Sequence, residues 1–558
     1  MTTTSSRPHQ AGAGAWATHE VFNQPPPLVD YNVYIADAAL AEGVARWDAA
    51  WAEPSLSEIG AAAGSAEAIQ LGEDANRNEP ELHTHDRYGA RIDEVSFHPA
   101  WHALMRRATG WGLHAAPWSD SRPGAHVARA AGFLVWSQAE AGHGCPISMT
   151  YSAIPALRVE PEVAAEWEPR FASREYDFGL RPAGEKRGAI CGMAMTEKQG
   201  GSDVRANTTR AVPTGDGRAY LLTGHKWFCS APMSDAFLTL AQAPGGLTCF
   251  LMPRVLPDGT RNGIAIMRLK DKLGNRSNAS SEIELHDAWA VRIGEEGRGV
   301  RTIIEMVNHT RLDCVTGTAS LMRQAVAQAI HHSAHRAAFG KTLIDQPLMT
   351  YTLADLALES EAATTLALRL AAACDRAASD PREAALKRIG VAAAKFWVCK
   401  RGPALTGEAM ECLGGSGYVE ESIMPRLYRE APVNSIWEGS GNVQALDVFR
   451  ALAREPVTAE ALFTEIEQAH GADQRLDAAT DRLRRELADT TQVEARARRV
   501  VELIALTLQG SLLARYAPTP VADAFIASRL GGDWGHTLGT LPPGADARAI
   551  VERARPLA

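Results

Sequence analysis

Four long stretches of helical periodicity between residues 300 and 454 constrain this chain more than any other feature. Apolar residues recur in them at helical spacing, and several stretches exceed about 25 residues. Helices of that length bury an apolar stripe most readily against one another, so the pattern predicts a helical bundle. The expected helices are Val300–Ala338, Tyr351–Ala378, Arg382–Leu413 and Val443–Arg454.

The periodicity changes between residues 186 and 290, where short β-prone runs replace the helical pattern. Clusters of Gly and Pro, such as APGG and LPDGTRNG, bound many of these runs. This arrangement predicts a small, mostly antiparallel β domain. Its expected strands are Tyr220–Thr223, Phe237–Ala241, Thr248–Met252, Gly263–Met267 and Glu282–Leu285.

The chain has 558 residues, more than one hydrophobic core can hold, so several domains are expected. We predict an α+β fold in which helical domains flank the β domain. From Ala36 to about Leu180 the pattern is mainly helical, and the region after Pro456 is helical again. The predicted parts are a disordered tail (1–18), an N-terminal helical domain with an extension (19–185), the β domain (186–290), a C-terminal helical domain (291–455) and an added helical tail (456–558).

Charge and cysteine usage narrow the class of protein. The net charge is −9 and the pI is about 6.0, so the chain as a whole gives no electrostatic case for nucleic acid. The eight cysteines form no C-x-x-C pair, and the adjacent His331 and His332 cannot converge on one ion from a helix. No signal peptide and no apolar run of about 20 residues are present. We therefore expect a cytoplasmic protein with reduced thiols, no metal and no membrane contact.

The segment NSIWEGSGN (Asn434–Asn442) presents a single carboxylate, Glu438, just before an apolar helical run. Ser440 or Asn442 could cap that helix, and free backbone N–H groups at its start could face an anion or a polarised carbonyl. Taken alone, the pattern favours an exposed capping turn over a functional site.

Two more stretches carry residue types that could contact a ligand. In GMAMTEKQGGSDV (Gly192–Val204) a Gly-rich turn flanked by hydroxyls could approach a planar polar ligand or a phosphate, although an ordinary loop is the commoner explanation. No G-x-G-x-x-G motif occurs, which disfavours a Rossmann NAD site. In GHKWFCSAP (Gly224–Pro232) a strand would turn Trp227 and Phe228 to opposite sides, with Ser230 on the face of Phe228.

The segment HRAAFGKTLIDQ follows the first long helix. Arg336 and Phe339 lie three residues apart, which on a helical turn would put them on one face. A guanidinium beside an aromatic ring suits a pyrophosphate next to an adenine ring. A surface arginine beside a buried phenylalanine would explain the pair equally well.

Together these stretches resemble the acyl-CoA dehydrogenase family. The T-E-x-x-x-G-S-D loop, the G-x-K-x-aromatic-x-S strand, the K-L-G-x-R turn, R-x-x-F-G, LGGSGY (Leu413–Tyr418) and W-E-G occur in the family's order over Gly192–Arg450. Within the family, VFNQPPPL, FHPAWH, KDKLGNRSNAS and PVNSIWEGSGN, together with the helical tail after Pro456, most resemble the AidB branch, flavoproteins of the bacterial response to DNA alkylation.

The resemblance implies FAD as cofactor and a homotetramer built as a dimer of dimers. It places the catalytic base at Glu438 and gives Ser230 a hydrogen bond near flavin N5, with Phe228 in place of the family's usual tryptophan. Glu411 and the position of Gln346 depart from the family pattern. The implied cofactor contacts are Met193, Met195, Thr196, Ser202, Phe228, Cys229, Ser230, Ile436, Trp437, Gly439, Ser440, Gly441 and Asn442, with Arg336, Phe339, Gly414 and Gly415 reaching FAD from a neighbouring subunit.

The resemblance also implies an activity. In the family the base removes the α-hydrogen of an acyl-CoA thioester while hydride leaves the β-carbon for the flavin. Burial beside Trp437 and the flavin would raise the pKa of Glu438 toward a useful base. The Glu438 backbone N–H, with a flavin ribityl hydroxyl, would polarise the thioester carbonyl.

The AidB branch further implies binding of double-stranded DNA. From Pro456 onward the tail holds twelve arginines, no lysine and fourteen acidic residues, a net charge of −2. Its arginine clusters could form a stripe facing phosphates, and a solvated helix laced with ion pairs would explain them equally well. The candidate DNA contacts are Arg482, Arg484, Arg485, Arg496, Arg498 and Arg499.

Three functions are consistent with these features. The first is an AidB-type flavoprotein that binds duplex DNA and protects it or counters alkylating agents, with weak dehydrogenase activity on acyl-CoA of the isovaleryl type. The second is a metabolic acyl-CoA dehydrogenase with Glu438 as base. The third is a non-catalytic DNA-binding scaffold with a structural FAD.

Overall fold

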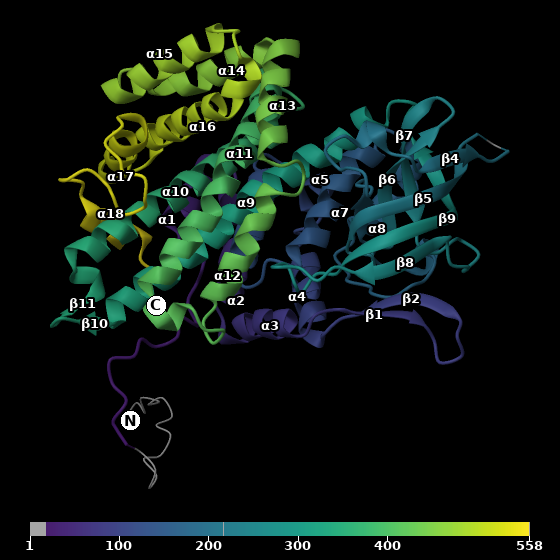
Figure 1. Cartoon of the computed structure of the whole chain (residues 1–558), viewed down its shortest axis with the longest axis horizontal. Coiled ribbons are helices and arrows are strands. Elements are labelled where there is room, and N and C mark those ends of the chain that lie inside the picture. The colour runs from purple at the N-terminus through teal and green to yellow at the C-terminus, as the bar shows by residue number, and fades with distance from the viewer. Residues whose placement is uncertain (1–17, 216, 557–558) are drawn as a thin grey trace.

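The centre of the molecule is a bundle of long helices, shown by a computed structural model that describes residues 18–215 and 217–556 (Figure 1). The positions predicted for these helices are confirmed to within a few residues. In α11 the start is defined by Pro381 in the first turn and by the Asp380 carboxylate, which accepts the backbone N–H of Arg382 at 2.8 Å. The bundle helices are α9 (Gly299–His335), α10 (Pro347–Arg376), α11 (Pro381–Cys412) and α13 (Gly441–Arg454).

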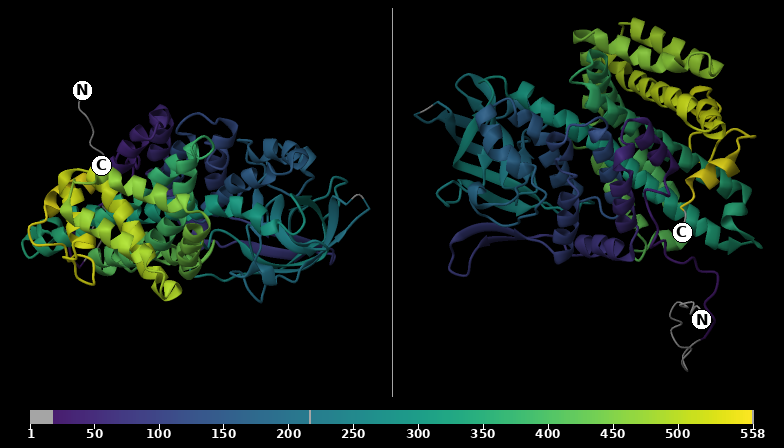
Figure 2. Two further views of the ribbon diagram at one scale, coloured as in Figure 1. Left: turned by 90° about the horizontal axis from the view of Figure 1, so that it is seen from above. Right: turned by 180° about the vertical axis from the view of Figure 1, so that it is seen from behind.

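Helix α9 is buried around most of its circumference. The N-terminal helices cover one side of the bundle, and the tail packs on another side (Figure 2). One hydrophobic core runs through all three parts, from Leu28 to Val551. The N-terminal helices are α1 (Ala38–Arg46), α2 (Glu53–Ala63), α3 (Ala66–Arg77), α4 (Pro99–Gly110), α5 (Ala116–Ser119), α6 (Ala125–Trp136), α7 (Gly144–Leu157) and α8 (Pro161–Phe171).

The N-terminal region is mainly helical, as predicted, but it also contains a β hairpin that was not predicted. Strands β1 (Glu81–His85) and β2 (Arg91–Ser96) form an antiparallel hairpin whose turn contains Gly89 at a φ of 86°. Leu82 and Val95 pack on the core of the β domain, so the hairpin joins the two domains. Its strands, ELHTH and RIDEVS, contain few apolar residues, and they fall between the helical stretches of this region.

The middle domain is a closed β barrel. The strand order is β3–β6–β4–β5–β9–β7, and β6 also pairs with β7, which closes the ring; β8 pairs with β9. Most pairs are antiparallel, as predicted, but β3 runs parallel to β6, and β5 and β9 are much longer than expected. The strands are β3 (Cys191–Ala194), β4 (Arg210–Pro213), β5 (Ala219–Ser230), β6 (Ala236–Ala243), β7 (Gly246–Pro253), β8 (Ile264–Leu269) and β9 (Ser280–Ile293).

The tail forms helices that pack on the bundle, away from the barrel (Figures 1 and 2). Between α9 and α10, strands β10 (Ala337–Ala338) and β11 (Lys341–Thr342) form a small hairpin. The remaining helices are α12 (Met424–Glu430), α14 (Val457–Ile466), α15 (Gln474–Ala488), α16 (Val493–Tyr516), α17 (Thr519–Phe525) and α18 (Ala547–Ala554).

Three further predictions concerned a disordered N-terminal tail, a membrane span and a metal site. The disordered tail at residues 1–18 falls almost wholly outside the described residues. Over those residues, no helix has the length and apolar character needed to cross a membrane, and no group of three or more His, Cys, Asp or Glu side chains is arranged to hold a metal ion.

Candidate active site

Glu438 lies in a tight left-handed turn immediately before α13. Its φ is 59°, a conformation that is uncommon for a residue with a side chain, and Gly439 follows at 93°. A Cβ at Gly439 would approach the Gln444 side-chain nitrogen to 2.8 Å, so this position requires glycine. Ser440 is the N-cap residue, as predicted, but neither its side chain nor that of Asn442 caps the helix; the Asn442 oxygen accepts instead from Arg498 at 2.9 Å.

Hydrogen bonds from Arg311 on α9, Lys395 on α11 and Gln444 on α13 hold the backbone of this turn. The carbonyl oxygen of Glu438 accepts from Arg311 Nε at 3.2 Å and from Gln444 Nε2 at 2.9 Å. The carbonyl oxygen of Gly439 accepts from the same Gln444 amide and from Lys395 Nζ at 2.8 Å. These bonds stabilise a backbone conformation that would otherwise be strained.

The Glu438 carboxylate points toward α9. Its Oε2 atom accepts a 2.6 Å hydrogen bond from the Thr310 hydroxyl. Burial raises the pKa of the Glu438 carboxyl above its ordinary value, and the Thr310 hydrogen bond and the charges of Lys395 and Arg311 oppose that rise. A carboxyl whose pKa is raised by burial is a stronger base than an exposed one, which suits a general base.

The thiol of Cys145, in the first turn of α7, lies close to Glu438 and to Ser230 of the barrel. Burial raises the pKa of this thiol to about 12, the nearby Glu438 charge adds to the rise, and hydrogen bonds with Asn278 and Ser230 oppose it. Ser230, at the end of β5, lies 3.2 Å from the Ser280 hydroxyl. The structure therefore brings the predicted base and the predicted flavin contact Ser230 to one place, between the helices and the barrel.

A buried carboxylate fixes the loop that contains Met195, Thr196 and Ser202. Glu197 accepts from Lys226 Nζ at 2.9 Å, from the Thr209 hydroxyl at 2.6 Å and from the Thr208 backbone N–H at 2.7 Å. The Thr196 carbonyl accepts the Trp227 N–H at 2.8 Å, which ties the loop to β5. Met193, Met195 and Thr196 are half-buried and Ser202 is exposed, so this loop can contact a ligand beside β5.

The side chains of the predicted flavin contacts on strand β5 differ in their exposure to solvent. Phe228 is 48% exposed and Ser230 is half-buried, while Cys229 is fully buried, so Cys229 can offer a ligand only its backbone. Lys270 Nζ lies 4.6 Å from the centre of the Phe228 ring. The aromatic wall predicted for the flavin is thus open to a ligand.

Arg336 and Phe339 do not share a helical turn, and this prediction was wrong. Helix α9 ends at His335, and Phe339 lies at the tip of the β10–β11 hairpin with a φ of 52° and a fully exposed ring. Arg336 donates to the Asn23 carbonyl at 2.6 Å, and Gln346 braces the hairpin through the Ala338 carbonyl at 3.0 Å. The helix ends at His335, three residues earlier than the predicted end at Ala338, and the Gly-Lys turn of the hairpin follows.

The hairpin is far from Glu438 within one chain. Arg311, beside Glu438, and Arg336 lie at opposite ends of a continuous stretch of α9, which corresponds to about 38 Å along the helix. Gly414 and Gly415 follow α11 and are likewise exposed, with open space around them. These residues fit a role in contacting a second copy of the chain rather than the site in their own chain.

Comparison with known proteins identifies the family. Over residues 192–288 and 297–453 the chain matches the middle and C-terminal domains of acyl-CoA dehydrogenases, and over residues 23–178 it matches the N-terminal domain of the adaptive response protein AidB. The AidB protein of Escherichia coli K12 is 49% identical over 91% of this chain and 94% of its own length. The chain belongs to the acyl-CoA dehydrogenase family, in its AidB branch.

Two further relatives of the family support this assignment. Acyl-CoA dehydrogenase family member 11 of Caenorhabditis elegans is 30% identical over 83% of this chain and 80% of its own. The structure of C. elegans ACDH-11 in complex with C11-CoA superposes with a TM-score of 0.82 at 27% identity, over 99% of this chain and 95% of that chain. An acyl-CoA dehydrogenase of Bacillus anthracis complexed with FAD shares the fold, with a TM-score of 0.62 at 19% identity over 82% and 79% of the two chains.

Members of the family use FAD, and the residues present here fit that group. Large apolar side chains are exposed to solvent at the implied FAD-contact positions: Phe228 is 48% exposed, Ile436 is 64% exposed and Phe339 is fully exposed. An aromatic cofactor or a neighbouring subunit would cover such surfaces. The Ser230 hydroxyl at the end of β5 is half-buried and so remains accessible to a ligand as a polar group.

The arginines proposed for DNA contact lie on α15 and α16. Arg484 pairs closely with Glu467, Arg496 pairs with Glu486 at 2.8 Å, and Arg498 bonds Asn442. These pairs are typical of a solvated helix with ion pairs on its surface. A cleft of about 380 Å³ between the helices is nevertheless lined by Arg482, Arg485, Glu486, Asp489, Arg496 and Arg499.

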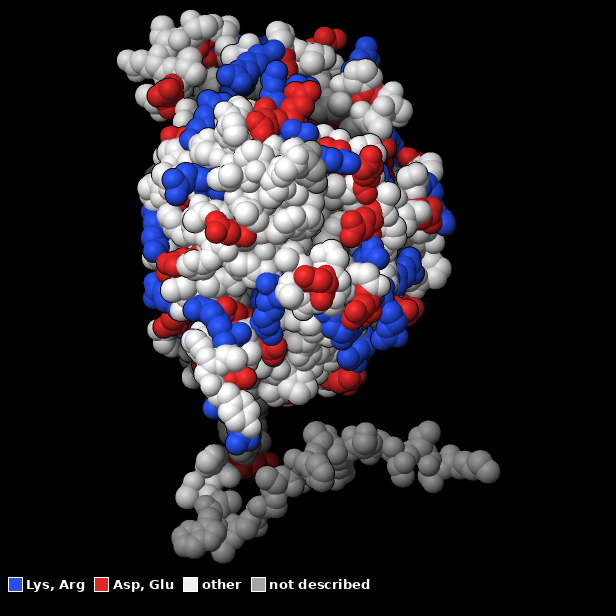
Figure 3. Space-filling view, turned by 90° about the vertical axis from the view of Figure 1, so that its right-hand side faces the viewer, with Lys and Arg blue, Asp and Glu red and all other residues white. Residues whose placement is uncertain are grey.

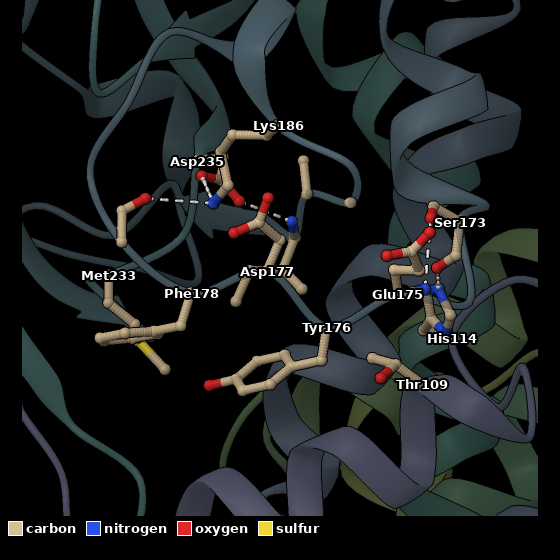
Figure 4. A pocket seen from close by; sticks show the side chains of 14 residues that line it. Thr109, His114, Ser173, Glu175, Tyr176, Asp177, Phe178, Lys186, Met233 and Asp235 are labelled. Atoms are coloured by element: carbon tan, nitrogen blue, oxygen red, sulfur yellow. Dashed lines mark hydrogen bonds and ion pairs between the residues drawn. The ribbon is translucent and has the colours of Figure 1, made fainter.

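A small polar cavity lies apart from Glu438, where residues 173–190 pass from α8 to the barrel. Figure 4 shows the Lys186–Asp235 ion pair at one side of it and the His114–Ser173 hydrogen bond at the other. Burial lowers the pKa of His114 to about 4, so this imidazole is neutral. With about 10 Å³ of free volume the cavity accommodates one water molecule, which excludes it as a substrate site.

Sequence reasoning missed the residues that hold the Glu438 turn: Thr310, Arg311, Lys395 and Gln444. Lys395 carried a usable signal, a charge inside the apolar run VAAAKFWVC. Arg311, Thr310 and Gln444 lie on helices where polar residues are ordinary, and only their tertiary contacts with Glu438 show what they do.

Proposed function

We propose that this protein is an FAD-dependent acyl-CoA dehydrogenase with Glu438 as its base. The observation that carries the proposal is the Glu438 carboxylate itself, which is held in a left-handed turn, bonded by Thr310 and raised in pKa by burial. Bound FAD would supply the hydride acceptor for the β-carbon.

The chain's own residues account for the proton and for substrate orientation. The Glu438 carboxylate takes the α-proton as the Cα–Cβ double bond forms, and the Thr310 hydroxyl fixes which oxygen carries it. The raised pKa increases the basicity of the carboxylate while the positive charges nearby keep it ionised. Because the turn is anchored through both carbonyls, the carboxylate is positioned before substrate binds.

Anaerobic mixing with a panel of straight and branched acyl-CoA thioesters tests this proposal. The holoenzyme should lose its visible flavin absorbance with at least one thioester, and Glu438→Gln should abolish that loss while keeping its FAD. Glu421→Gln, the same change at an exposed carboxylate, is the matched control and should behave as wild type. A wild-type protein that no thioester reduces would rule the proposal out.

A second candidate function, binding of duplex DNA in the response to alkylation, is favoured by the arginine-lined cleft. We propose that Arg482, Arg485 and Arg499 contact phosphates there, since Arg482 and Arg485 form no ion pair with any part of the chain that the structure describes. On the barrel face, by contrast, charges of both signs are interspersed around a mostly uncharged centre (Figure 3), which offers no competing stripe.

Titration into duplex DNA at increasing salt tests the second function. Binding should weaken with salt, and the Arg482→Ala/Arg485→Ala variant should bind less tightly with a shallower salt slope. Arg548→Ala, an exposed arginine on α18, is the control. Equal binding by both variants would exclude the cleft. A strain carrying Glu438→Gln then separates a catalytic protein from a non-catalytic scaffold under alkylator challenge.

We also propose a homotetramer built as a dimer of dimers. The support is the β10–β11 hairpin, whose Phe339 ring is fully exposed at the far end of α9 from Glu438. Sedimentation equilibrium of the holoprotein should give the mass of four chains, and Phe339→Ala should lower the FAD content. A monomer that retains FAD fully would contradict this assembly.

A further inference from the structure

Lys395 is a fully buried cation directly beneath the Glu438 turn. It lies in the middle of α11 and is only 1% exposed. Its Nζ atom donates to the Gly439 carbonyl at 2.8 Å. No carboxylate forms an ion pair with it anywhere in residues 18–215 or 217–556. A lysine in this position is unusual because a buried ammonium costs free energy unless its charge is used.

The groups around Lys395 leave Glu438 as the carboxylate that its charge affects. From α9 it faces the Cys314 thiol, and from its own helix it faces Cys399 and Lys400. Burial keeps both thiols protonated, and Lys400 is itself a cation, so neither neutralises the ammonium. The remaining neighbour is the turn before α13, where the Lys395 charge acts on Glu438.

The groups that face Glu438 come from three elements. Thr310 and Arg311 approach from α9, Lys395 from α11, and the Cys145 thiol from the start of α7. Arg311 also pairs with Asp447 at 2.8 Å, a carboxylate that it shares with Arg388 and Arg450. Lys395, by contrast, has no carboxylate partner in residues 18–215 and 217–556, and its charge lowers the pKa of Glu438 more than that of Arg311 does.

We propose that Lys395 is a positioning residue for the base: its hydrogen bond fixes the Gly439 carbonyl, and its unpaired charge keeps the Glu438 carboxylate ionised in a buried site. The inference rests on the proposed role of Glu438 as base. Glu438 becomes still more buried when cofactor and substrate cover it, and the charge of Lys395 offsets that desolvation without occupying the substrate's space.

Two substitutions separate the charge from the hydrogen bond. Lys395→Gln removes the charge and keeps a donor for the Gly439 carbonyl, while Lys395→Met removes both. Lys387→Met is the matched control, because Lys387 lies on the same helix and contacts His309 instead of the Glu438 turn. If the methionine variant does not fold, the glutamine variant still tests the charge.

The first readout is the titration of the Glu438 carboxyl itself. Infrared difference spectra of each holoprotein against its Glu438→Gln counterpart report the carboxylate band as a function of pH. Both Lys395 variants should raise the pKa of Glu438 by about one unit, a tenfold change in its proton affinity, and the Lys387 variant should not. A Glu438 pKa equal to that of wild type in both variants would overturn the inference.

The second readout is the pH profile of flavin reduction by acyl-CoA. The glutamine variant should shift the profile to higher pH at an unchanged plateau, and the methionine variant should also lower the plateau because the turn loses an anchor. If wild type is not reduced by any thioester, the proposed function fails, while the infrared titration still decides the role of Lys395. Unshifted profiles in both variants would contradict the inference.

Discussion

Replacement of Lys226 by methionine should destabilise the barrel strongly. Lys226 and Glu197 are both fully buried, 2.9 Å apart, and Lys226 also donates to the Leu240 carbonyl at 2.7 Å. The substitution leaves Glu197 as a buried carboxylate without its cation. Removing one partner of a buried pair costs about 3–5 kcal/mol, because the remaining charge is not solvated.

The pKa of Glu197 gives an independent magnitude. Burial raises it, but the Lys226 charge and the hydrogen bonds from Thr209 and Thr208 lower it from 4.5 to about 2. That shift corresponds to about 3 kcal/mol of stability. Because the folded pKa is depressed, this stability is fully present above the unfolded value of 4.5 and is lost as the pH falls toward 2.

Urea unfolding at pH 7 and at pH 3 measures both effects. Lys226→Met should lower the unfolding free energy by about 3 kcal/mol at pH 7, and Lys226→Met/Glu197→Gln should recover much of the loss. Arg261→Met is the control: its ion pair with Glu94, at 2.8 Å, is nearly as long as the 2.9 Å pair of Lys226, but the side chains are 38% and 53% exposed, so its loss should cost less than about 1 kcal/mol. Equal losses for the two single variants would refute the reasoning.

Two other predictions follow from the site. Glu438→Gln should raise the thermal stability of the apoprotein at pH 8 but not at pH 4, because burial raises the pKa of Glu438 and the ionised carboxylate destabilises the fold as the pH rises above 4.5; equal gains at both pH values would contradict it. Asn23→Ala should speed proteolytic cleavage at residues 336–342, since the Asn23 amide exchanges two hydrogen bonds with Ala337, at 2.9 and 2.8 Å, and Asn78→Ala should not.

The helices could be predicted from sequence because their information is local. Apolar spacing located α11 almost to the residue, and in the structure Pro381 in the first turn and Asp380 as a cap account for where it begins. The β1–β2 hairpin was missed for the opposite reason. Its strands are short, it sits between helices, and it is stabilised by packing Leu82 on the barrel, a contact that no local pattern contains.

The predictions for the candidate site also differ in the kind of information on which they rest. Glu438 and Ser230 were proposed because the motifs around them resemble a family, and in the structure both lie near the Cys145 thiol, while their roles stay predictions. Arg336 and Phe339 were assigned to a helical turn because apolar spacing continued, whereas the glycine turn and the bonds of Asn23 end the helix at His335. A three-residue spacing indicates a shared face only where the helix persists.

The tail is coupled to the site instead of being a separate appendage. Arg498, from α16, donates to Asn442 in the first turn of α13 and lies over the Phe396 ring of α11, one residue from Lys395. The tail also shares the core of the bundle. A ligand that reorients α16 at the arginine cleft would therefore act on the helix that begins at the Glu438 turn, and these contacts would link any DNA-binding function to any dehydrogenase function.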